Sequence, residues 1–435
     1  MIVTGLVSSH RAKKGSNDFD TFYLSGQAVL ENHSMYYQGE YYEGAPGQAP
    51  FLYAPIASIF FTPFALMPIQ ISAFLWNLFL ACLFAVNFLF LFSLCRLTKS
   101  ELRIKWSNFS KFDRCLYAAI ILALLLDNLA MAQINILIIT FCLASLYFWN
   151  HKKAFLGGTI LSLAILFKLT PLLFAFYFLI KRQWKMLAFT FLGLLFFTLI
   201  IPGFIFGKEQ NRLYHRQWLG RTLKPLYIGY YSKLHPEDPH PKKQSADLIQ
   251  NNHLTELLNE KNQALKGVLT RLFLKNRPSY GYQSEPIYVA RRYEKMPVIL
   301  GGLPKEPLFF LIFVLQLSIL GFLIFQWARC GKPSPWHLPA EISTVFSAMT
   351  LLSPVARSHQ FVAWIVPYTV LFFLSDPGIK SSFETKGRHL FTLAKISILI
   401  YFLQVLPYGK AVGMGFWANA FILLASLRFL IQTKQ

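Results

Sequence analysis

The chain has 435 residues, of which 54% are hydrophobic, 17% are aromatic and only 14% are charged, and its formal net charge is +22. This composition excludes an ordinary soluble domain and is typical of a polytopic membrane protein. The basic residues gather in short loops between apolar segments, which argues against nucleic acid as the partner of the positive charge.

The first part of the chain is predicted to lie outside the bilayer. Residues 1–17 contain too short an apolar stretch for a cleavable signal peptide, and we interpret them as the remnant of a first span or a tail. Residues 18–69 form a first outer-face loop with an interfacial helix over 19–30 and a re-entrant or interfacial helix from Tyr53 to Met67. If this second helix crossed the membrane, Asp18 would lie in the cytoplasm.

Apolar segments then recur at lengths typical of membrane spans, since about 20 apolar residues cross a hydrocarbon core. Residues 70–207 form a transmembrane core, residues 208–305 form a large polar outer-face loop with short helices, and residues 306–435 form the C-terminal transmembrane helices. The predicted fold is an all-α polytopic membrane protein of about 11 transmembrane helices. The predicted spans are 71–92, 116–128, 134–149, 155–167, 169–180, 186–206, 308–327, 342–352, 361–374, 390–406 and 412–431.

Loops rich in Lys and Arg alternate along the chain with loops that contain few of them. This pattern is typical of cytoplasmic and outer loops, respectively. The intervening turns hold one basic residue each, namely Lys168, Arg357 and Lys410. Asp18, Lys168 and Arg357 are therefore predicted to share the outer face. The basic loops lie at 96–114, 152–153, 181–185, 329–332 and 380–388.

Polar groups at a membrane rim are costly, so each is a functional candidate. Asp18 is the leading candidate for a general base, because a carboxylate can take the proton of a sugar hydroxyl within hydrogen-bond reach. Asp20 points the same way in an extended segment but diverges by about 200° on a helix. The alternative is two solvated loop acids. Their spacing could hold a divalent ion, but two carboxylates are too few ligands to indicate a metal site.

Cations and amides on the same face suit an anionic sugar donor. Lys168, between two apolar segments, either snorkels to the interface or pairs with an anion. Arg357 and His359 could hold a phosphate through charge-assisted hydrogen bonds, or could simply belong to a polar turn. Gln133 and Asn135 offer hydrogen bonds to sugar hydroxyls, although such a turn is more often a helix cap. Tyr53 and other tyrosines near the outer boundary could stack on sugars or form the aromatic belt.

Several motifs together resemble those of glycosyltransferase family 87, and the resemblance covers nearly the whole chain beyond residue 17. Two motifs near the N-terminus are Asp18-Phe19 followed by Phe22-Tyr23, and Phe51-Leu52-Tyr53-Ala54-Pro55. Each motif is loose alone, whereas their order and spacing are fairly specific. The remaining matches are residues 63–68, Gln133-x-Asn135, Lys168-x-x-Pro171, Asn262 to Leu265, and Ser353 to His359.

The resemblance implies a GT-C fold and the transfer of a sugar, usually mannose, from a polyprenyl-phosphate donor to an acceptor hydroxyl on the outer face. The catalytic aspartate of the family falls on Asp18, and its donor-phosphate positions fall on Lys168 and His359, with Arg357 beside them. Transfer with inversion is expected. The matched motifs also make substrate-binding candidates of Asp20, Tyr23, Tyr53, Gln133, Asn135 and Asn262.

The expected partners are the lipid-phosphate donor, a glycolipid or glycan acceptor and membrane lipids, with no resident cofactor and no nucleic acid. We expect an integral protein of the inner membrane of a prokaryote with an outward-facing site. One alternative is a transporter or flippase of a lipid-linked or anionic solute, although the two related halves with broken helices are not evident. Another is a polysaccharide polymerase or ligase with a lipid-diphosphate donor, which would favour more arginines at the site.

Overall fold

The computed structural model describes residues 18–36, 51–97, 106–223, 262–275, 300–329, 337–353, 355–374, 384–405, 409–410 and 412–432. Within these ranges the chain is helical and contains no strand, apart from one isolated parallel bridge between Leu274 and Leu303. The predicted segment 1–17 and most of the predicted loop 208–305 lie outside the described residues.

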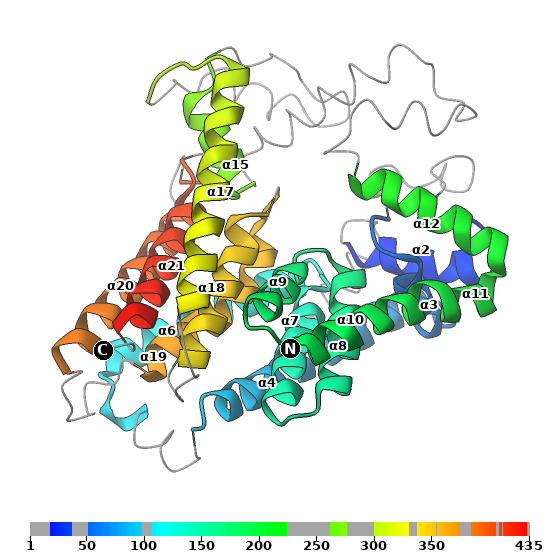
Figure 1. Ribbon diagram of the computed structural model, residues 1–435, viewed down its shortest axis with the longest axis horizontal. Helices are drawn as coiled ribbons and strands as arrows, with labels where there is room; N and C mark the ends of the chain where they lie inside the picture. The colour runs from blue at the N-terminus through cyan, green and yellow to red at the C-terminus, as the bar shows by residue number, and fades with distance from the viewer. Residues whose placement is uncertain are drawn as a thin grey trace.

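The helices form one bundle around a shared apolar core. Figure 1 shows α17 to α21 on one side, α2, α3 and α12 on the other, and α4 and α7 to α10 between them. The helices are α2 (Phe19–Leu30), α3 (Pro55–Ala65), α4 (Ile69–Leu94), α6 (Lys111–Ala130), α7 (Asn135–Asn150), α8 (Ala154–Phe167), α9 (Leu172–Ile180), α10 (Trp184–Leu195), η2 (Phe196–Ile200), α11 (Ile201–Phe206), α12 (Lys208–Leu223), α15 (Leu265–Phe273), α17 (Lys305–Arg329), α18 (His337–Leu351), η3 (Ser358–Trp364), α19 (Ile365–Leu374), α20 (Glu384–Phe402), η4 (Leu403–Val405) and α21 (Met414–Gln432).

The all-α fold class is confirmed, because the described elements are all helices, but the count of about 11 transmembrane helices is not confirmed. In the described ranges, four helices are long and apolar enough to cross a membrane: Ile69–Leu94, Trp184–Phe206, Lys305–Arg329 and Met414–Ile431. The others are short. The 14 residues of α8 rise only about 21 Å, less than the roughly 30 Å of a hydrocarbon core. The predicted interfacial positions of α2 and α3 stay predictions.

The span Trp184–Phe206 contains a π-helical turn, and proline explains it. Pro202 has no backbone N–H, so the carbonyl of Thr198 loses its partner four residues on. The chain forms η2 at this point, and Asn211 of α12 donates a hydrogen bond of 2.9 Å to the freed carbonyl of Thr198. Gly207 then ends the helix with a positive φ of 79°. The span and α12 are thereby joined at this side of the bundle.

Helix α2 is held against α3 and α4 by close packing around one tryptophan. Gly26 of α2 allows this approach, because an added Cβ would lie 2.7 Å from the carbonyl oxygen of Phe61. The ring of Phe22 stacks on Phe61 at 4.7 Å, and the ring of Phe61 meets Trp76 at 4.9 Å. Tyr23 donates a hydrogen bond of 2.8 Å to the carbonyl of Met67. These contacts fix the start of α2, where Asp18 lies.

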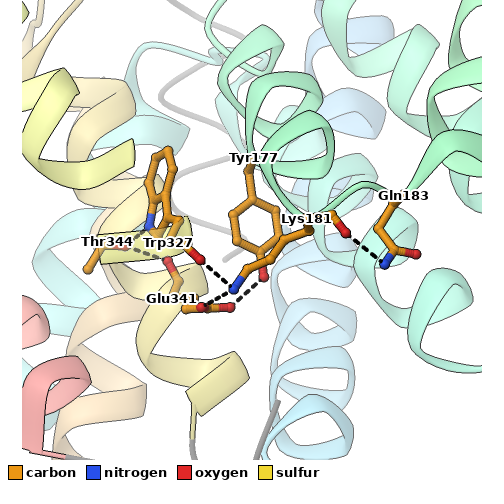
Figure 2. A network of polar contacts seen from close by, with 6 residues as sticks. All are labelled: Tyr177, Lys181, Gln183, Trp327, Glu341 and Thr344. Atoms are coloured by element: carbon orange, nitrogen blue, oxygen red, sulfur yellow. Dashed lines mark hydrogen bonds and ion pairs between the residues drawn. The ribbon is translucent and has the colours of Figure 1, made fainter. Parts of the chain in front are cut away.

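A buried ion pair joins α9, α17 and α18 on the other side of the bundle, as Figure 2 shows. Glu341, only 1% exposed, accepts from Lys181 at 2.5 Å and from the Tyr177 hydroxyl at 2.7 Å. Lys181 also donates to the carbonyl of Trp327 at 2.9 Å, and the Trp327 indole donates to Thr344 at 2.9 Å. A buried charge pair of this kind is tolerated because both partners have further hydrogen bonds.

Candidate active site

The turn between α6 and α7 organises the site. Ala132, which follows the C-cap of α6, is in the left-handed region at a φ of 49°, an unusual conformation for a residue other than glycine. The turn is held from outside by two donors: the indole of Trp76 donates to the Ala132 carbonyl at 2.9 Å, and the backbone N–H of Asp18 donates to the Met131 carbonyl at 3.3 Å. The strained turn therefore places Gln133 beside Asp18.

Asp18 is half-buried at the N-cap of α2, and the amide of Gln133 donates a hydrogen bond to its carboxylate. Burial raises the pKa of the Asp18 carboxyl, while the hydrogen bond from Gln133 and the charges of Arg357 and Lys168 oppose this rise. A carboxylate with a raised pKa is a stronger base when ionised. Gln133, Arg357 and Lys168, which lower its pKa, were predicted on the same outer face as Asp18. The structure brings these three residues and Asp18 together.

Lys168 lies at the break between α8 and α9. Its backbone is extended and Pro171 follows three residues later, so the helix stops and the side chain leaves the apolar face. The Lys168 ammonium donates a hydrogen bond of 2.8 Å to the amide oxygen of Asn135. Burial lowers its pKa to about 8, against the opposing effect of Asp18. Lys168 thus faces the site, and burial makes its charged form less favourable than that of an exposed lysine.

Arg357 and His359 lie in the segment that leads into η3. Arg357 is extended and half-buried, whereas His359 is 6% exposed. The carbonyl of His359 accepts hydrogen bonds from the amides of Asn128 at 2.9 Å and Asn135 at 3.3 Å. Burial and the charges of Lys168 and Arg357 lower the pKa of the His359 imidazole to about 3. His359 is therefore neutral at neutral pH, and Arg357 and Lys168 supply the positive charge that faces Asp18.

Asn262 is buried, and its side chain forms hydrogen bonds with backbone groups near the site. Its side-chain oxygen accepts from the backbone N–H groups of Ala264 at 3.0 Å and Ala356 at 3.2 Å. Its own carbonyl accepts from Arg271 at 2.7 Å, and the N–H of Gln263 donates to the Ala356 carbonyl at 2.6 Å. These bonds hold the residue that precedes Arg357. In this structure Asn262 is a positioning residue for the phosphate-binding candidates.

The other predicted candidates differ in where they lie. Tyr53 is close enough to Asp18 that the carboxylate adds to the effect of burial in raising the pKa of its phenol, and its ring meets Phe22 at 5.1 Å. Asp20 is 3% exposed inside the first turn of α2, so the helical alternative for the Asp18-Asp20 pair applies. The hydroxyl of Tyr23 donates its hydrogen bond to the carbonyl of Met67, just after the end of α3.

Two residues important for the site were not singled out from the sequence. Asn128 ends a predicted span and donates to His359, and Ala132 provides the left-handed turn. A buried amide in an apolar helix is a recognisable signal for Asn128, whereas an alanine gives none. In the part of the chain that the structure describes, no group of three His, Cys, Asp or Glu side chains is arranged to hold a metal ion.

Part of the chain matches a known protein family. Residues 51–237 match glycosyltransferase family 87, a range that contains Tyr53, Gln133, Asn135 and Lys168. No solved structure matches the chain.

Curated mycobacterial proteins share parts of the sequence. A polyprenol-phosphate-mannose-dependent alpha-(1-2)-phosphatidylinositol pentamannoside mannosyltransferase of Mycolicibacterium smegmatis is 25% identical over 231 residues, covering 52% of this chain and 53% of that protein. A polyprenol-phosphate-mannose-dependent alpha-(1-2)-phosphatidylinositol mannoside mannosyltransferase of the same organism is 28% identical over 179 residues, covering 38% and 39%. This chain thus spans about half the length of the curated relatives that it matches. The predicted resemblance to glycosyltransferase family 87 is confirmed by this match, which covers residues 51–237 and does not include Asp18, Asn262 or His359.

Proposed function

We propose that this protein is an integral membrane glycosyltransferase that moves a hexose from a polyprenyl-phosphate donor to a hydroxyl of a glycolipid acceptor. The observation that carries the proposal is the convergence of one carboxylate with the basic residues on a single turn. Gln133 of this turn contacts Asp18, and Asn135 contacts both the Lys168 ammonium and the His359 carbonyl. The curated relatives are named for a polyprenol-phosphate-mannose donor and phosphatidylinositol mannoside acceptors, which favours mannose and a glycolipid here.

In the proposed reaction, Asp18 removes the proton of the acceptor hydroxyl while its oxygen forms a bond to the anomeric carbon of the donor sugar. The bond from that carbon to the phosphate oxygen breaks, and its electron pair stays on the departing polyprenyl phosphate. One displacement of this kind inverts the anomeric centre. Lys168 and Arg357 stabilise the phosphate by charge, and His359 donates a hydrogen bond as a neutral imidazole.

Positioning supplies much of the catalysis in this scheme, because a phosphate is already a good leaving group. Asn135 would set the position of the Lys168 ammonium, and Gln133 would orient the Asp18 carboxylate. The scheme uses no resident cofactor. The site would face outward, because the basic loops of the sequence lie at the other ends of the same helices.

A direct test gives the purified protein radiolabelled polyprenyl-phosphate mannose with a panel of glycolipid acceptors. We expect a labelled glycolipid, and no transfer when a nucleotide sugar or a lipid-diphosphate oligosaccharide replaces the donor. Analysis of the anomeric configuration in the product tests inversion. Movement of the lipid-linked sugar across vesicles without a covalent product would instead indicate the transporter alternative.

A further inference from the structure

A cavity of about 700 Å³ lies away from the candidate active site, at the ends of α4, α7 and α9 and the start of α10. Four of its lining residues are the cations Arg96, Lys152, Arg182 and Lys185, and its lining contains no acidic residue. Lys181, next to Arg182, is paired with Glu341, but none of the four lining cations forms an ion pair within the described ranges. Among the described residues, the lining of the cavity is therefore strongly positive.

The cavity and the candidate active site lie at opposite ends of α7. Asn135, the first residue of this helix, contacts Lys168, and Asn150, its last residue, lines the cavity. The 16 residues of α7 rise about 24 Å along its axis, so the two sites do not share ligands. By the distribution of basic loops in the sequence, the cavity is on the cytoplasmic side.

The walls of the cavity combine charge with apolar surface at a membrane boundary. Trp184 lines the cavity, is 63% exposed, and is the first residue of the apolar span Trp184–Phe206. Met186 and Leu338 provide apolar lining, and Phe155 and Phe191 are large exposed side chains on the adjoining helices α8 and α10. Exposed indoles are common at the level of lipid headgroups, and basic pockets there bind anionic headgroups.

Three of the four cations occupy a backbone position that usually favours glycine. Arg96, Lys152 and Arg182 each follow the C-cap of their helix with φ values of 53°, 60° and 54°. Gly or Asn is the common choice at this position, and a long side chain there is strained. A cation near a helix C-terminus also interacts favourably with the helix dipole. The dipole explains one such residue, but it does not explain why three of them line one cavity.

We propose that this cavity binds the phosphate headgroup of an anionic phospholipid from the leaflet opposite the candidate active site. The phosphate lies among Arg96, Lys152, Arg182 and Lys185, and the acyl chains follow the exposed apolar surface beside Trp184. A soluble phosphate would use the cations but not the exposed indole and the apolar lining. The occupant that fits both features is a lipid.

The test measures retention of phosphatidylglycerol by the purified protein in neutral detergent, using native mass spectrometry, with phosphatidylcholine and inorganic phosphate as separate probes. We compare the wild type with the triple variant Arg96→Asn/Lys152→Asn/Arg182→Asn, because Asn tolerates the left-handed conformation and should keep all three helix ends intact. Each lost charge is expected to weaken binding roughly fivefold, so the triple variant should bind about 100-fold more weakly. Its melting temperature should be unchanged or higher.

The matched control is Lys153→Asn, which removes an exposed charge next to Lys152 that does not line the cavity. We expect it to bind phosphatidylglycerol like the wild type. Equal retention of phosphatidylcholine, equal weakening by Lys153→Asn, or displacement of the lipid by millimolar inorganic phosphate would each overturn the proposal. A lower melting temperature with unchanged lipid binding would show that the cations serve the helix dipole only. A further test needs only the wild type: retention of phosphatidylglycerol should fall as the salt concentration is raised. Retention that does not fall would overturn the proposal.

Discussion

The substitution Asp18→Asn tests the proposed mechanism most directly, because it removes the base while keeping the shape of the side chain. The side-chain oxygen of Asn can still accept the hydrogen bond that Gln133 donates, so the contact that orients residue 18 is retained. Burial opposes the charged form of Asp18, so a neutral residue at this position should not destabilise the fold. The substitution should therefore lower the reaction rate without lowering the stability of the fold.

Loss of a general base usually costs roughly 10²- to 10⁴-fold in rate. At about 1.36 kcal/mol for each factor of ten, this is about 2.7–5.4 kcal/mol of the barrier. We expect kcat to fall by this factor near pH 6.5, with little change in the KM for the donor. Because the Asp18 carboxylate also supports the charge on Lys168, the variant should lose donor affinity at a lower pH than the wild type does.

The assay is the initial rate of mannose transfer from radiolabelled polyprenyl-phosphate mannose to a saturating glycolipid acceptor. Asp20→Asn is the matched control, since it makes the same change two residues later inside α2. We expect Asp20→Asn to alter the melting temperature more than kcat. The reasoning is refuted if Asp18→Asn keeps a third or more of the wild-type kcat, or if Asp20→Asn reduces kcat as strongly.

Three further predictions concern the groups around the site and the ion pair on the other side of the bundle. The KM for the donor should rise as pH increases through about 8, because burial lowers the pKa of Lys168 to this value. Lys168→Arg should remove the rise, because a guanidinium group stays protonated. A wild-type KM that does not depend on pH would contradict this. Ala132→Val should cost about 2–3 kcal/mol of unfolding free energy, because a branched side chain would be both strained and overpacked in the buried left-handed turn, and thermal unfolding would detect it. Glu341→Ala should cost about 3–5 kcal/mol of unfolding free energy, because it leaves Lys181 buried without its partner. The double variant Lys181→Met/Glu341→Leu should recover most of this free energy. Equal melting temperatures for the two variants would contradict the role given to the ion pair.

The sequence predicted local features well because they depend on neighbouring residues. Helix α2 covers Phe19 to Leu30 as expected, and the break at Lys168 follows from the proline three residues later. The number of spans was less predictable. An apolar segment such as α7 is buried inside the protein along nearly its whole length, so hydropathy alone does not distinguish a helix that meets lipid from one that meets other helices.

Contacts between distant parts of the chain could not be read from the sequence. The contact between Gln133 and Asp18 joins residues 115 positions apart, and it depends on a left-handed alanine that no motif marks. Asn262 illustrates the same point, because its side chain holds the backbone of Ala356, 94 positions along the chain, while its predicted contact with substrate stays a prediction. The sequence could identify which polar residues are costly to bury, but only the fold shows which backbone groups they contact.

The protonation states at the site suggest the order in which its parts act. Lys168 and His359 both have lowered pKa values, of about 8 and about 3, because burial disfavours their charged forms. A donor phosphate between them would favour the charged form of Lys168, which burial alone makes costly. The same negative charge would raise the pKa of Asp18 further and make its carboxylate a stronger base. Donor binding would therefore prepare the acid–base chemistry before the acceptor arrives, and departure of the polyprenyl phosphate would reverse both effects.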